Sequence, residues 1–258
     1  MVSSSMIEGA LRRDRVVVVF ALLGVIILAW SYLLLGAVVS MDEMIGMPMA
    51  QQQPIWTPAY AAVVLAMWAV MMAAMMLPSA APMILLYGTI ANRREQKGDP
   101  AIGAGVFGLG YIVVWTAFSL AAVALQFGLD HAQLLSPMMS VTSRSVAGGV
   151  LIAAGVYQWT PLKQACLRRC RSPLEFLMTE WREGRVGALK MGLRHGMYCL
   201  GCCWMLMLLL FVGGIMNIAW IAAVAAFVLI EKVSPAGHWI GRVTGVLLAV
   251  WGAAILVF

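Results

Sequence analysis

The sequence predicts an all-α fold, a polytopic bundle of transmembrane helices, from its composition and from the spacing of its apolar runs. Of the 258 residues, 63% are hydrophobic and only 11% are charged. Soluble domains carry roughly 25% charged residues. Apolar runs of about 20 residues, the length that crosses a bilayer, follow one another along the chain. We therefore expect one transmembrane helical domain over residues 1–258, with no room for a separate soluble domain.

Seven spans are predicted, over residues 16–39, 58–90, 102–127, 145–159, 196–216, 218–230 and 238–258. The fourth and sixth are short, so six spans plus a re-entrant segment is the alternative. The first run exceeds an ordinary signal-peptide core, and no small-residue cleavage site follows it. It is therefore interpreted as a retained helix.

The basic residues predict the orientation of these spans. All but one of the 17 Lys and Arg, the exception being Arg144, fall near alternate loops. Cytoplasmic loops of membrane proteins carry such an excess of positive charge. This distribution predicts an N-terminus inside, a C-terminus outside and a multi-pass protein of the bacterial inner membrane. Glu231 and Lys232, at the inner end of the sixth span, are interpreted as interfacial anchors.

The start of the fifth span carries a cluster of candidate metal ligands. His195, Cys199 and Cys202 are spaced i, i+4 and i+7, which puts them on one face of a helix. Cys203 lies about 100° further round and is the weakest member of the set. Cysteine and histidine are ligands that suit copper and zinc. The predicted topology places these thiols on the reducing side, where structural disulfides are rare.

The loop before this span, residues 160–195, carries a second pair of cysteines. Cys166 and Cys170 are spaced i and i+4, so one helical turn places both on one side. We expect the neighbouring Arg168 and Arg169 to lower the pKa of both thiols. The stretch 174–185 mixes apolar with charged residues and predicts an amphipathic helix along the inner surface.

Methionine is unusually abundant, with 20 residues, about half of which gather in the outer loop and the second span. Met44 and Met47 belong to the cluster in the outer loop, whereas Met71 and Met75 belong to a stripe in the second span. Thioethers are soft ligands suited to Cu(I), although a methionine stripe in a helix is also ordinary packing. Methionines outside and cysteines inside are the distribution that a Cu(I) carrier requires.

Two prolines, Pro78 and Pro82, interrupt the second span. Each removes a backbone donor, so we expect the helix to kink or break there. The predicted topology brings Pro78 and Cys199 to similar depth. A binding site that uses both spans is therefore compatible with the topology.

Three sequence segments carry a resemblance to a known family. They are Met71-Met-Ala-Ala-Met-Met-Leu-Pro78, the stretch from Tyr157 to Pro173 with its Cys-Leu-Arg-Arg-Cys core, and Gly192-Leu-Arg-His-Gly-Met-Tyr-Cys-Leu-Gly-Cys-Cys-Trp204. Together they resemble a bacterial family of predicted metal-binding integral membrane proteins, a domain of unknown function also labelled a copper chaperone family. The resemblance implies a metal-binding role in the inner membrane.

The favoured function is Cu(I) binding, delivery or transfer through Cys, His and Met ligands, with zinc as the alternative metal. The expected contacts are the bilayer, the metal ion and a small partner protein that accepts the metal; nucleic acid is not expected. Two other functions stay open: a structural or assembly subunit of a membrane complex, and a thiol-disulfide oxidoreductase. No hydrolytic or ATP-binding motif is present, so we do not expect an enzyme.

Overall fold

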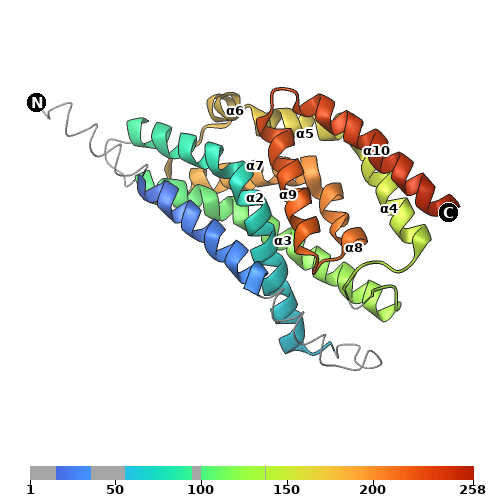
Figure 1. Cartoon of the computed structure of the whole chain (residues 1–258). Helices are drawn as coiled ribbons and strands as arrows, with labels where there is room; N and C mark the ends of the chain where they lie inside the picture. The colour runs from blue at the N-terminus through green and yellow to red at the C-terminus, as the bar shows by residue number, and fades with distance from the viewer. Residues whose placement is uncertain (1–15, 36–55, 95–99, 137) are drawn as a thin grey trace, which may run out of the picture.

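The computed structural model describes residues 16–35, 56–94, 100–136 and 138–258, and these are almost entirely helical (Figure 1). An unlabelled helix, Val16–Leu35, comes first. The labelled helices are α2 (Pro58–Arg94), α3 (Pro100–His131), α4 (Arg144–Tyr157), α5 (Pro161–Arg171), α6 (Pro173–Glu180), α7 (Gly184–Leu208), α8 (Leu210–Gly213), α9 (Ile218–Val233) and α10 (Gly237–Val257). The predicted all-α class is confirmed for these residues.

Five helices are long and apolar enough to cross a membrane: Val16–Leu35, Pro58–Ala91, Gly103–His131, Gly184–Gly213 and Gly237–Val257. The chain is therefore a membrane protein. The predicted fourth and sixth spans correspond to α4 and α9, which have only 14 and 16 residues. The count of seven spans and the orientation of the termini stay predictions.

Glycines let the helices of the bundle approach closely. A β-carbon at Gly110 or Gly192 would collide with the backbone of the facing helix across the α3–α7 contact. Gly155 on α4 lies in the same way against Gly245 on α10, so α4 and α10 run side by side (Figure 1). Small residues at helix contacts permit this packing in membranes. Helix α7 is thereby fixed in the middle of the bundle.

Helix α2 is continuous through both of its prolines, so the expected kink or break at Pro78 is not a break, and the kink stays a prediction. Proline at position 78 leaves the carbonyl of Ala74, four residues earlier, without its helical donor. The indole Nε1 of Trp30, on the first helix, donates to that oxygen over 3.3 Å. A neighbouring helix thus replaces the lost hydrogen bond, which is the way that membrane helices tolerate proline.

The predicted loop 160–195 is largely helical. It contains α5, α6 and the first three turns of α7, which begins at Gly184 rather than near residue 196. The predicted amphipathic helix over 174–185 is shorter and ends at Glu180. Phe176 and Leu177 are buried on α6, whereas Leu174 and Met178 are exposed. Helices α5 and α6 therefore cap one end of the bundle, near the start of α10 (Figure 1).

Candidate metal centre

Helix α7 contributes three buried thiols. Cys199, Cys202 and Cys203 are each at most 1% exposed. The thiols of Cys202 and Cys203 both donate to the carbonyl oxygen of Cys199, each over 3.0 Å. The structure buries the whole i, i+4, i+7 stripe of His195, Cys199 and Cys202. Cys203 is no less buried than these residues, and its lower rank as a metal ligand stays a prediction.

Helix α5 lies along α7 and contributes the other two thiols. Thr160 caps α5 by accepting from the backbone amide of Lys163, and Pro161 begins the helix. Cys166 Sγ lies beside Gly201, where an added β-carbon would be 2.6 Å from the sulfur. Cys170 is hydrogen-bonded to Cys199 and Cys202. All five cysteines of the chain are free thiols.

Met76 of α2 completes the group. Its thioether sulfur lies 3.9 Å from Cys203 Sγ. We call Met76 and the five cysteines the sulfur cluster; its members are Met76, Cys166, Cys170, Cys199, Cys202 and Cys203. The hydroxyl of Tyr111, on α3, donates to the Met76 carbonyl over 3.2 Å and lies 3.0 Å from Cys199 Sγ. Residues far apart in sequence therefore converge on one buried place.

Lys232 is the residue that the sequence analysis misassigned. It is 9% exposed, and its ammonium donates to Cys199 Sγ over 2.9 Å and to Ser79 Oγ over 3.1 Å. It is therefore part of the site and not an interfacial anchor. The signal available in the sequence was the adjacent pair Glu231-Lys232 directly after an apolar run, which is costly unless partnered.

Glu231 is likewise buried and not an anchor. Its carboxylate accepts from the ammonium of Lys163 over 2.8 Å, and both side chains are at most 1% exposed. This ion pair joins α9 to α5. It thus fixes the helix that carries Lys232 against the helix that carries Cys166 and Cys170.

His195 lies in an aromatic enclosure beside the sulfur cluster. The rings of Phe107, Tyr111 and Phe176 have centroids 5.5 to 6.0 Å from its imidazole. The side chain is 3% exposed, and its Nδ1 has no hydrogen-bond partner among the described residues. A buried ring nitrogen without a partner retains its capacity to bind a proton or a metal.

The arginines of α5 do not activate its thiols, contrary to the sequence analysis. Burial raises the pKa of Cys166, and hydrogen bonds to Cys199 and Cys202 raise the pKa of Cys170 well above its ordinary value. Arg171 instead donates to the carbonyl oxygens of Ser234 and Pro235. Arg169 pairs with Glu175 at the exposed surface. These guanidinium groups hold helices together.

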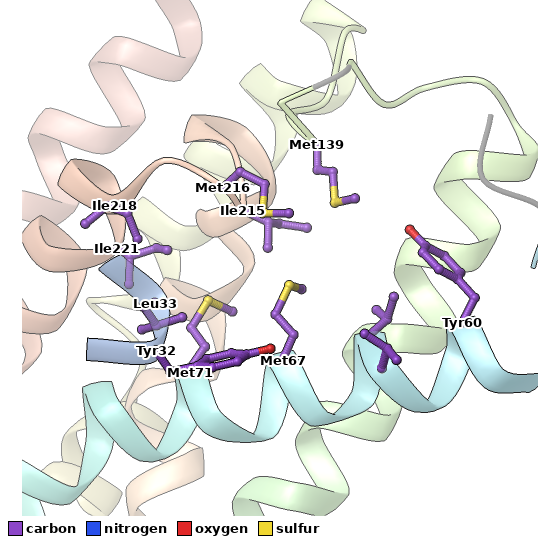
Figure 2. A pocket seen from close by; sticks show the side chains of 12 residues that line it. Tyr32, Leu33, Tyr60, Met67, Met71, Met139, Ile215, Met216, Ile218 and Ile221 are labelled. Carbon is purple, nitrogen blue, oxygen red and sulfur yellow. The ribbon is translucent and has the colours of Figure 1, made fainter. Parts of the chain in front are cut away.

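The methionine stripe of α2 is buried. Met71 and Met75 are each 1% exposed, and Met72 is fully enclosed. Met44 and Met47 lie outside the described residues. Near the start of α2 there is a cavity of about 230 Å³, lined by Met67, Met71, Met139 and Met216 together with apolar residues and two tyrosines (Figure 2). We call this cavity the methionine pocket.

Within the described parts of the chain, no three His, Cys, Asp or Glu side chains are arranged as a ready-made metal site. Thiols of the sulfur cluster are hydrogen-bonded to one another, to the Cys199 carbonyl and to the Lys232 ammonium. A metal ion would have to replace these contacts. The donor set itself, three buried thiols and two half-buried thiols with one buried thioether, has the softness that Cu(I) requires.

These features define a helical membrane protein with a buried group of sulfur ligands. The sequence model of the PpoB2 family, described as a copper chaperone, matches residues 65–255, and the chain belongs to that family. The resemblance seen in the sequence is thereby confirmed, and the matched region includes the whole sulfur cluster. No curated protein and no solved structure shows significant similarity to the chain.

Proposed function

We propose that this protein binds Cu(I) at the sulfur cluster and passes it to an acceptor protein, without catalysing a reaction. The single observation that carries the proposal is the convergence of Met76 with five thiols from two other helices. Membership of a copper chaperone family supports copper in preference to zinc. The basic loops support an orientation with the cluster near the cytoplasmic side of a bacterial inner membrane.

Binding would proceed by exchange of protons for metal. Two thiols would each release a proton, and their sulfurs would coordinate one Cu(I), which leaves a complex with one net negative charge. Metal binding by thiols releases protons in this way. The Lys232 ammonium, already 2.9 Å from Cys199 Sγ, would offset that charge. The cluster then combines soft ligands with a fixed countercharge beside the buried thiols of α7.

The experiment that tests this proposal is a competition titration with a Cu(I) chelator on the purified protein under anaerobic conditions. Loss of outer-shell groups already weakens metal sites by roughly 10- to 100-fold. We therefore expect Cys199→Ser with Cys202→Ser to lower the affinity of the tightest site more than about 100-fold. X-ray absorption should show sulfur coordination in the wild type.

Met178→Leu is the matched control, because Met178 is 74% exposed on α6 and contributes a sulfur atom remote from the cluster. It should bind copper as the wild type does. Equal affinity in the wild type and the double cysteine variant would refute the site. Tight zinc with no Cu(I) binding would refute the metal, and a stoichiometric partner retained by a protein that binds neither would favour the structural role.

A further inference from the structure

The methionine pocket is a cavity whose walls come from separate parts of the chain. Met67 and Met71 lie on α2, Met139 lies in the segment between α3 and α4, and Met216 precedes α9. Figure 2 shows these four side chains extending from their segments toward one shared space. Four thioethers of distant origin around one cavity differ from a methionine stripe on a single helix.

The lining excludes most ligand classes. Among the described residues that line the pocket, none is charged, and only Tyr32 and Tyr60 bear side-chain oxygen atoms. Calcium and magnesium require several oxygen ligands, whereas zinc is held by thiolates, imidazoles or carboxylates. Neutral thioethers suit Cu(I). The chemistry of the walls therefore selects a soft monovalent cation.

Met139 is held in place at a cost. Its φ of 53° lies in the left-handed region, where a residue with a side chain is strained. Its sulfur accepts from Gln126 Nε2 over 3.3 Å, and Gln126 is 1% exposed. Gln126 Oε1 in turn accepts from the indole of Trp68 over 2.7 Å. A buried amide and a strained backbone thus orient one thioether of the pocket.

The pocket is connected to the sulfur cluster through α2. Met71 lines the pocket, and Met76, five residues later, contacts Cys203. Five residues advance a helix by roughly 7.5 Å. Met72 and Met75 are buried between them. The pocket is therefore about one and a half helical turns along α2 from the cluster, with two buried methionines between them.

We propose that the methionine pocket is a second Cu(I) site, built from thioethers alone and distinct from the sulfur cluster. This inference rests on the proposed copper function and adds a site to it. Because its ligands are neutral, the pocket binds Cu(I) more weakly than the thiols do. Its ligands also keep their sulfur unpaired under oxidising conditions, since thioethers form no disulfides.

The test is an anaerobic titration with Cu(I) alone, comparing four proteins: the wild type, Met67→Leu with Met139→Leu, Met178→Leu, and Cys199→Ser with Cys202→Ser. Leucine conserves the volume of methionine, so the pocket variant should fold. We expect two equivalents in the wild type. The pocket variant should weaken the second equivalent at least tenfold and leave the first unchanged.

The variants separate the two proposals. The cysteine variant should retain the weaker copper equivalent. If adding Met67→Leu with Met139→Leu to that variant then removes this equivalent, the pocket site is supported even where the sulfur cluster proves not to bind copper. If the pocket variant binds both equivalents as the wild type does, the pocket inference is overturned. Met44→Leu with Met47→Leu is a parallel variant. If this variant loses the weaker copper equivalent and the pocket variant keeps it, the pocket inference is also overturned.

Discussion

The sulfur cluster and the methionine pocket both depend on α2, yet their surroundings differ. Around the cluster lie an ammonium, a tyrosine hydroxyl and, one residue along α9, the Lys163–Glu231 ion pair. The pocket has largely apolar walls with two tyrosines, and one amide behind the wall orients Met139. Thiols become anions when they bind metal and need a countercharge, whereas thioethers stay neutral. The thiol ligands of the cluster therefore require charged and polar groups around them, whereas the thioethers of the pocket require only that their side chains be oriented toward one space.

The largest effect should come from breaking the framework of the cluster. Glu231→Ala leaves the Lys163 ammonium buried without its partner, and such a loss costs about 3–5 kcal/mol. We expect a marked fall in the unfolding temperature of the detergent-solubilised protein, as measured by tryptophan fluorescence. Glu175→Ala removes the exposed pair with Arg169 and is the control, expected to cost under about 1 kcal/mol. Equal effects would mean that the buried pair does not hold the cluster together.

A smaller change tests the pocket side of the comparison. Met67→Leu conserves volume and removes only a thioether. The free energy of unfolding should therefore fall by less than about 1.5 kcal/mol, which gives only a small change in the unfolding temperature. The unfolding temperature of Met67→Leu is measured in the same way and compared with that of Glu231→Ala. A fall as large as that of Glu231→Ala would show that the pocket methionines are structural after all.

How far the sequence predicted the cluster depends on which helix is considered. Helical phase placed His195, Cys199 and Cys202 on one stripe of α7, and the structure buries all three side chains. Burial does not separate Cys203 from that stripe, because α3, α4 and α5 all pack on α7 and faces 100° apart are both buried. A period identifies a buried face only where the opposite face meets solvent or lipid.

The place of Lys232 in the site was not predicted, and the reason is physical. A lysine at the end of an apolar run is usually an anchor that reaches the interface. Its burial here depends on the packing of α9 against α2, which brings Ser79 within 3.1 Å of the ammonium. Similarly, the prolines correctly marked a disturbed part of α2, but the repair comes from Trp30, 44 residues away. Both outcomes rest on contacts between distant segments.

The reactivity of Cys166 sharpens the account of the cluster. Its pKa is raised by burial, and the thiolate is the form that is alkylated. The thiol is therefore protonated at neutral pH, and its alkylation should accelerate roughly tenfold per pH unit up to and beyond pH 9, in proportion to the thiolate fraction. Peptide-resolved mass spectrometry after timed alkylation measures this rate. The protein in denaturant is the control; a rate that levels off near neutral pH would contradict the raised pKa.

The smallest expected effect concerns the part of α2 between the two regions. Trp30→Phe removes the donor that satisfies the Ala74 carbonyl and should cost about 1 kcal/mol, the usual net value of one hydrogen bond. Pro78→Ala restores the helical donor to the same carbonyl. In the Pro78→Ala background, Trp30→Phe should therefore cost less, and the difference between the two backgrounds measures the repair directly. If the cost is the same in both, the indole stabilises α2 by packing alone, and the continuity of the helix between the methionine pocket and the sulfur cluster needs another cause.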